Sequence, residues 1–206
     1  MKKMKIGIFS DIHATPEPVR EALEIFSREA VDRVLCAGDI AGYGTQLEQT
    51  VELLIGCRCL AVRGNHDQWW LEGEGDWRTG PLANYLHNLP MTYDLYFAGQ
   101  KLHMVHGSPS ASLMDGIRLL DEHADLRMDQ VEYWRQYLDG FDFDLLVVGH
   151  THQVFAERLG RILVVNPGST LFNHTCAILT LPEMSVRILP LGGKTPVLTW
   201  NWGMPW

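Results

Sequence analysis

Short apolar runs alternate with amphipathic stretches through the first third of the chain. Each apolar run ends at polar residues, which is typical of a buried strand. Three such strands are predicted, at residues 5–12, 33–40 and 59–62. The stretches between them, 16–30 and 45–56, have the apolar spacing of helices, and the first has prolines at its entry. Strands and helices in this alternation predict a parallel sheet with crossover helices.

The second half of the chain is predicted to contain more strand than helix. Residues 92–108 have the pattern of a hairpin that turns at Gly99 and Gln100. A helix is predicted at 128–141 and a buried strand at 144–150, and short strands alternate with tight turns beyond that point.

Two intervening segments have weaker patterns. Residues 68–90 contain three tryptophans and one short predicted helix, at 81–89. Residues 107–128 are predicted to form a loop that holds a helical turn or two. The helix-rich beginning and the strand-rich end together predict an α/β fold in which a sandwich of two sheets is flanked by helices.

Composition and charge narrow the class of protein. With 206 residues, 46% of them hydrophobic and 20% charged, the chain is predicted to be a single globular domain, 1–206, with a tryptophan-rich tail at 190–206. The net charge of −8 argues against general nucleic-acid binding, although not against nucleotides. No apolar run approaches the ~20 residues of a membrane span or forms a signal-peptide core, so no membrane association and a cytoplasmic location are predicted. The pair Cys57 and Cys59 is weak evidence for zinc, and reduced thiols are the preferred interpretation.

Polar residues that can ligate metals follow five of the predicted strands. They are carboxylates, imidazoles and one amide: Asp11, His13, Asp39, Asn65, His106, His150 and His152. Taken one at a time, each motif is as readily a turn, a helix cap or a buried histidine. In open α/β sheets, however, ligands bind at the carboxyl ends of the strands. The five strand ends together therefore predict a metal site.

The ligand types indicate which metals would bind and how many. Carboxylates, imidazoles and an amide without thiolates suit divalent transition-metal ions, with manganese favoured and iron, cobalt, nickel or zinc as alternatives. Seven candidate ligands suit two ions rather than one. Two ions about 3.5–4 Å apart hold the attacking and leaving oxygens of a phosphoryl displacement. A carboxylate must bridge such a pair, and Asp39 is the first choice.

Six motifs give the chain a family resemblance. D-I-H, G-D-x-x-G-Y-G, G-N-H-D, H-G-S-P and G-H-T-H follow one another between residues 11 and 152, and N-P-G-S lies at 166–169. In this order they resemble the calcineurin-like metallophosphoesterases, in particular small bacterial and archaeal members of the phosphodiesterase type. The resemblance implies a four-layer α/β/β/α sandwich of two mixed sheets flanked by helices, with a binuclear metal site at the strand ends.

The resemblance also implies a role for each matched residue. The first metal would be held by Asp11, His13 and His152, and the second by Asn65, His106 and His150, with Asp39 as the bridge. The nucleophile would be a metal-bridging hydroxide. His66 would act as a general acid or stabilise charge on the transferring phosphoryl group. Asp67 would either orient His66 or cap the next helix.

Arg63 stands where the Ser/Thr protein phosphatases of the superfamily, with R-G-N-H-E, have a phosphate-binding arginine. A guanidinium suits bidentate binding of phosphate, so Arg63 is a candidate for that role, with a surface arginine as the alternative. Those phosphatases read G-D-x-x-D-R-G at the second motif, whereas this chain has Gly42, Tyr43 and Gly44. A protein phosphatase is therefore not expected.

Two groups of tryptophans are candidates for binding. Trp69 and Trp70 would either form a wall on which a flat leaving group stacks or pack into the core under the following helix, and core packing is preferred. The tail contains Trp200, Trp202 and Trp206. They are predicted to cover an apolar groove on this chain or on a second copy, and the second option would give a homo-oligomer.

The predicted function is a metal-dependent phosphoesterase. The first choice is a phosphodiesterase that acts on a nucleotide-like or other small diester in an open site. A phosphomonoesterase is the second candidate, and a dinucleoside-polyphosphate hydrolase is the third. A non-catalytic scaffold of the same fold is disfavoured, because it would lack ligands or the equivalent of His66.

Overall fold

Two five-stranded mixed sheets form the centre of the computed structural model, which describes residues 3–73, 79–110 and 112–200. The first sheet has the order β10 (Ser185–Pro190), β9 (Thr175–Leu181), β1 (Met4–Phe9), β2 (Arg33–Cys36) and β3 (Leu60–Ala61). The second has the order β4 (Thr92–Phe97), β5 (Gln100–Val105), β6 (Leu145–Val147), β8 (Ile162–Pro167) and β7 (Val154–Leu159). In the second sheet the parallel pairs β5–β6–β8 lie between antiparallel edge pairs. In the first sheet the parallel pairs β1–β2–β3 extend to one edge and the antiparallel pairs β10–β9–β1 to the other.

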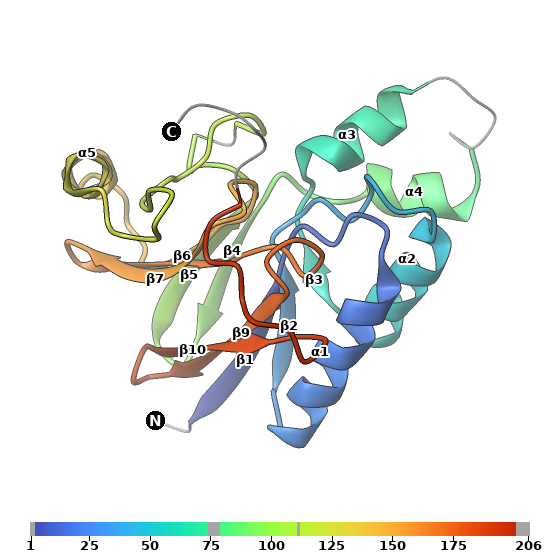
Figure 1. Ribbon diagram of the computed structural model, residues 1–206, viewed down its shortest axis with the longest axis horizontal. Coiled ribbons are helices and arrows are strands. Elements are labelled where there is room, and N and C mark those ends of the chain that lie inside the picture. The colour runs from blue at the N-terminus through green and yellow to red at the C-terminus, as the bar shows by residue number, and fades with distance from the viewer. Residues whose placement is uncertain (1–2, 74–78, 111, 201–206) are drawn as a thin grey trace.

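Within the described ranges, five helices cover the outer faces of the two sheets. They are α1 (Pro16–Arg28), α2 (Leu47–Gly56), α3 (Asn65–Glu72), α4 (Pro81–His87) and α5 (Met128–Leu138). In Figure 1, α1 to α4 lie on one side of the molecule and α5 on the other. The layers are therefore helix, sheet, sheet and helix, which confirms the predicted α/β/β/α sandwich. Among the described residues, no helix is both long and apolar enough to cross a membrane.

Three apolar clusters hold these layers together. The cluster between the sheets contains Ile6 and Leu35 from the first sheet and Met104 from the second, all buried. A second cluster packs α1 and α2 onto the first sheet, and a third packs α5 onto the second sheet. A Cβ atom at Gly7 would lie 2.5 Å from the ring of Phe26, so the absence of a side chain there lets α1 approach β1 closely.

The structure differs from the sequence expectations in two loops. The β4–β5 hairpin turns at Ala98 and Gly99, one residue earlier than predicted, because both adopt positive φ and Gln100 pairs with Phe97. No helix forms in the described residues between β5 and α5. Instead, the buried amide of Gln153 accepts hydrogen bonds from two backbone N–H groups of this segment and donates one to a carbonyl. This side chain replaces the hydrogen bonds that a helical turn would have supplied.

Candidate metal centre

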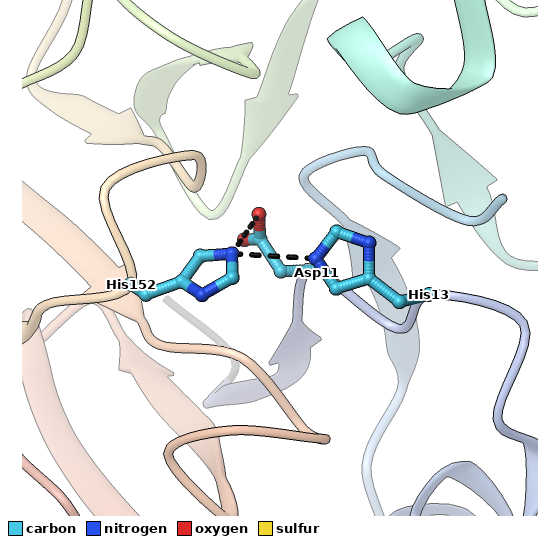
Figure 2. Close-up of side chains that lie close together, drawn as sticks. All are labelled: Asp11, His13 and His152. Atoms are coloured by element: carbon cyan, nitrogen blue, oxygen red, sulfur yellow. Dashed lines mark hydrogen bonds and ion pairs between the residues drawn. The ribbon is translucent and has the colours of Figure 1, made fainter. Parts of the chain in front are cut away.

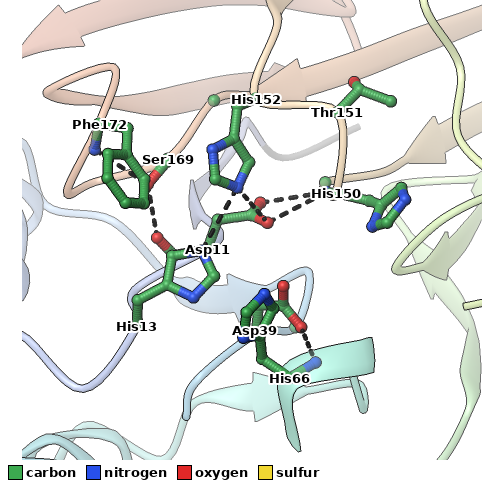
Figure 3. A network of polar contacts seen from close by, with 12 residues as sticks. Asp11, His13, Asp39, His66, His150, Thr151, His152, Ser169 and Phe172 are labelled. Atoms are coloured by element: carbon green, nitrogen blue, oxygen red, sulfur yellow. Dashed lines mark hydrogen bonds and ion pairs between the residues drawn. The ribbon is translucent and has the colours of Figure 1, made fainter. Parts of the chain in front are cut away.

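The predicted ligands meet at one end of the sandwich, where strands of both sheets finish. Asp11 follows β1 and Asp39 follows β2, whereas His106 and His150 follow strands of the second sheet. Figure 3 shows the side chains of Asp11, His13 and His152 close together, with Asp39 beside them. Strand ends of two different sheets thus supply one site, which is buried because the sheets pack face to face.

The backbone at this site has an uncommon conformation. Five of the seven candidate ligands have positive φ angles of 50–64°, although none is glycine: Asp11, His13, Asp39, His150 and His152. A left-handed backbone conformation directs the chain sharply away from the strand direction. Residues with a Cβ atom adopt this conformation at an energetic cost. The ligand side chains are therefore placed by strained turns that the surrounding fold holds in position.

The first group of ligand atoms comes from Asp11, His13 and His152 (Figure 2). The Nε2 atom of His152 lies 3.1 Å from Oδ1 of Asp11 and 3.3 Å from Nε2 of His13. Burial alone would raise the pKa of Asp11, but the charge of His152 and its hydrogen bond outweigh burial and hold that pKa well below its usual range. The carboxylate is therefore ionised and available to a cation.

The second group surrounds the side chain of Asn65. Its Oδ1 atom lies 3.0 Å from Nε2 of His106 and 2.9 Å from Nδ1 of His150. Nε2 of His106 is also 3.4 Å from Oδ1 of Asp39. Asp39 has ligand atoms within range of His13 on one side and of His106 on the other. It therefore lies between the two groups, as a bridging carboxylate must.

Backbone carbonyls orient three of the histidines. Nδ1 of His13 donates to the carbonyl of Ala41, Nδ1 of His106 to that of Ala37, and Nε2 of His150 to that of Met114, at 3.3, 2.7 and 3.1 Å. In each ring the opposite nitrogen faces the centre. Metal-bound histidines usually have their second nitrogen fixed in this way.

The charges around these rings also fit a cation. Burial comes first among the causes that lower the pKa values of His13 and His150 to about 4, so both are neutral at pH 7. Burial would lower the pKa of His106 too, but the carboxylate of Asp39 raises it to about 10. Buried carboxylates, an amide oxygen and imidazoles that converge on one point are the donor set of a divalent transition metal, and His106 would lose its proton to join that set. The residues present therefore fit the two ions expected from the sequence.

His66 lies at the edge of this cluster. Its backbone N–H donates to Oδ1 of Asp39 at 2.8 Å, which ties the start of α3 to the loop after β2. Its half-buried ring contacts the rings of His13, Tyr43 and Trp69, each with a centroid distance of 4.8 Å to His66. Its nitrogens also come within ligand range of His13 and Asp39. The side chain of His66 is thus beside the two groups of candidate ligand atoms and open to solvent on one side.

Asp67 joins two loops of the site. One carboxylate oxygen accepts the N–H of Ala41 at 2.7 Å and the other accepts the N–H of Gly64 at 2.8 Å. The second contact caps α3, which agrees with one of the two roles expected from the sequence. Burial and the nearby charge of Asp39 raise the pKa of Asp67 to about 7. Both of these hydrogen bonds are to the backbone, and one of them lies at the start of α3, the helix that carries His66.

Arg63 is directed toward α4. Its guanidinium donates to the carbonyls of Leu86 and His87 at 3.3 and 2.6 Å and to Oε1 of Gln68 at 3.1 Å. These carbonyls belong to the last turn of α4, where cations are favourable. In this conformation Arg63 stabilises the packing of α4, and binding of phosphate by Arg63 stays a prediction.

The tryptophans divide between core and surface. Trp70 packs against the apolar cluster beneath α3, as expected, whereas Trp69 is 47% exposed and lies beside His66. In the tail, the ring of Trp200 contacts that of Phe172 at a centroid distance of 5.0 Å, and the backbone N–H of Trp200 donates to the carbonyl of His152. Trp200 therefore packs on this chain, while Trp202 and Trp206 lie outside the described residues.

Two residues that support the site had no role assigned from the sequence. Ser169 donates from Oγ to the carbonyl of Asp11 at 2.6 Å and thereby fixes the turn after β1. Nδ2 of Asn166 donates to the carbonyl of Gly149 at 3.0 Å, just before His150. Both lie in N-P-G-S, so this motif was the available signal, although its function becomes visible only when the two sheets meet.

An α/β/β/α sandwich that brings carboxylates and imidazoles together at the ends of its strands has the arrangement of a metal-binding phosphoesterase. The chain matches the family model of the calcineurin-like phosphoesterase superfamily domain over residues 4–183. It belongs to that superfamily, as the motifs predicted.

Relatives and solved structures agree with this assignment. The chain is 28% identical over 187 residues to the uncharacterized protein MJ0912 of Methanocaldococcus jannaschii, covering 82% of this chain and 70% of that protein. It is 25% identical over 190 residues to phosphodiesterase MJ0936 of the same organism, covering 89% and 92%. The crystal structure of a metallophosphoesterase from Sphaerobacter thermophilus has the same fold, with a TM-score of 0.70 at 23% identity, and the match covers 91% of this chain and 88% of that one.

Proposed function

We propose that the protein is a phosphodiesterase that hydrolyses a small, nucleotide-like diester at a centre of two divalent metal ions. The observation that carries the proposal is the convergence of seven ligand side chains from both sheets, with His66 beside them. A relative named phosphodiesterase, matched over most of both chains, favours diesters over monoesters. The fit of the donor set favours manganese or a similar transition metal.

The proposed ligand sets follow the two groups of atoms. One ion would be held by Asp11, His13 and His152, and the other by Asn65, His106 and His150, with Asp39 between them. When bound, such ions act as Lewis acids toward the phosphoryl oxygens and supply a nucleophilic hydroxide at neutral pH. His13 and His150 keep a neutral imidazole nitrogen directed at the ions, because backbone carbonyls hold their other N–H groups, and His106 would lose its proton on binding.

His66 would transfer a proton to the oxygen of the leaving alcohol, or stabilise charge on the phosphoryl group. Its half-buried ring stands next to the ligand cluster and reaches solvent, as a group that meets substrate must. Asp67 would be a positioning residue, since it fixes the first turn of α3 on which His66 lies.

Hydrolysis of paired chromogenic substrates tests the function. Metal-stripped protein receives Mn²⁺, Ni²⁺, Zn²⁺ or Mg²⁺ and is assayed with a phosphodiester and the corresponding phosphomonoester. Faster metal-dependent turnover of the diester is expected. Faster turnover of the monoester would make the protein a phosphomonoesterase, and stoichiometric metal without turnover of either would favour a binding scaffold.

The role of His66 has its own test. His66→Ala is expected to lower kcat by about 10²–10⁴ while the bound metal stays stoichiometric. His123→Ala is the matched control, because His123 is exposed and forms an ion pair with its neighbour Glu122. Unchanged kcat in His66→Ala would contradict a catalytic role. Loss of metal would instead make His66 a ligand, which its distance to His13 and Asp39 allows.

A further inference from the structure

Two exposed aromatic side chains flank His66. Tyr43, from the loop after β2, is 56% exposed, and Trp69, on the first turns of α3, is 47% exposed. The centroid of each ring lies 4.8 Å from that of His66. The rings are inclined by 49° and 62° to the imidazole, so neither lies flat on it.

These exposed rings are part of a longer aromatic rim. The ring of Tyr43 also contacts His13 and Phe172, at 4.9 and 5.5 Å, and Phe172 contacts Trp200 at 5.0 Å. Phe172 and Trp200 are partly buried, whereas Tyr43 and Trp69 have about half of their surface in solvent. Apolar surface is thus left exposed at the point on the rim where His66 is.

The position of His66 determines what these rings would meet. A side chain that gives a proton to a leaving oxygen must come within about 2.6–3.2 Å of it. The first atoms of the leaving group then lie beside the imidazole, and the rest of that group extends over the neighbouring rings. Aromatic rings attract each other at centroid distances of about 4.5–7 Å in tilted or offset arrangements. The two rings are therefore within reach of a flat group on that oxygen.

We propose that Tyr43 and Trp69 bind the leaving group of the substrate and select diesters whose leaving alcohol carries a flat aromatic system such as a nucleobase. This inference rests on the proposed phosphodiesterase function and adds a specificity determinant to it. Because the net charge of the chain is −8, the metal centre rather than the protein as a whole would attract the phosphate. The apolar rings would discriminate between leaving groups.

The test compares two diesters with the same retained group, one with a 4-nitrophenyl leaving group and one with a fluoroalkyl leaving group. For each variant, kcat/KM is divided by the wild-type value on the same substrate, which removes the difference in leaving-group acidity. In Tyr43→Leu and Trp69→Leu, the aromatic diester is expected to lose about tenfold more activity than the fluoroalkyl diester, as expected for loss of one stacking ring. Equal losses on both substrates, or no loss on either, would overturn the inference.

Control variants separate stacking from other effects. Tyr43→Phe keeps the ring and should keep the wild-type preference between the two diesters. Tyr96→Leu removes a 67% exposed tyrosine from β4, outside the rim, and should leave both rates unchanged. A changed preference in Tyr43→Phe would assign the effect to the hydroxyl group rather than to the ring, and would also overturn stacking.

A binding measurement keeps the inference independent of turnover. The affinities of metal-loaded protein for adenosine 5′-monophosphate and for inorganic phosphate are measured by calorimetry. Wild type is expected to prefer the nucleotide, and Trp69→Leu to lose about tenfold in nucleotide affinity with phosphate affinity retained. Absence of hydrolysis in wild type would refute the proposed function alone. Equal affinity of wild type for nucleotide and phosphate would refute the aromatic site.

Discussion

Gly64→Ala should disable the metal centre without changing any ligand. Gly64 precedes Asn65, and its backbone passes so close to the loop after β2 that no side chain fits. An added Cβ would lie 2.1 Å from Oδ1 and 2.3 Å from the backbone N of Asp39. The φ angle of Gly64 is −102°, which alanine adopts readily, so the effect of the substitution is steric.

The size of the effect follows from these contacts. Contacts of Cβ below 3.0 Å are essentially never seen, so the two loops must separate by roughly 1 Å. Rotation of the Asp39 side chain cannot relieve the overlap, because one of the crowded atoms belongs to the backbone. Overpacking of this kind lowers the free energy of unfolding by about 1–3 kcal/mol. A displacement of about 1 Å at a catalytic site can lower kcat/KM about 10²-fold.

The assay combines denaturant unfolding of the metal-free protein, metal content and kcat/KM for the chromogenic diester. Gly56→Ala is the matched control: Gly56 ends α2, and nothing lies within 4 Å of its added Cβ. That variant should be unchanged in activity and more stable by up to about 1 kcal/mol. If Gly64→Ala keeps wild-type metal content and activity, the close approach of the two loops does not position Asp39.

Two further predictions concern the groups around the centre. Asp67→Ala should lower the free energy of unfolding by about 2–4 kcal/mol, because the buried N–H groups of Ala41 and Gly64 lose their acceptor. Asp67→Asn keeps one oxygen, so its stability should fall between those of the wild type and the alanine variant. Equal denaturation midpoints for all three proteins would contradict this role. Mn²⁺ binding at pH 8 should release about one proton from His106, since a pKa of about 10 keeps this residue protonated in the metal-free protein and a ligand must be neutral. The affinity for Mn²⁺ should therefore rise with pH. Calorimetry in two buffers of different ionisation enthalpy measures the proton release, and none would be seen if His106 is not a ligand.

The strand ends were the part of the site that the sequence could predict. A continuous apolar run followed by Asp39 or His106 places a ligand at a sheet edge, whichever sheet it belongs to. The fold followed from the same pattern, because alternating strands and helices leave few arrangements that bury every apolar face.

The features that the sequence did not predict have long-range causes. The partners of Arg63 lie in the last turn of α4, more than 20 residues away along the chain, and no local pattern indicates that contact. The sequence could not show which of Trp69 and Trp70 faces the core, because that depends on where α3 begins. That helix starts at Asn65 itself, so the ligand motif and the helix overlap. Likewise, the loop before α5 depends on the amide of Gln153 from beyond the next strand.

The left-handed turns at the ligands bear on what this chain was selected for. Each non-glycine residue in that conformation costs about 1–2 kcal/mol of folding free energy, and five ligands adopt it. Glycine would relieve the cost at any of these positions, and so would asparagine in part. A chain maintained only as a folded partner for other proteins would gain stability from such replacements. The presence of aspartate and histidine at all five turns is therefore what is expected of a chain selected for what these side chains bind, at the expense of the resistance of the fold to unfolding.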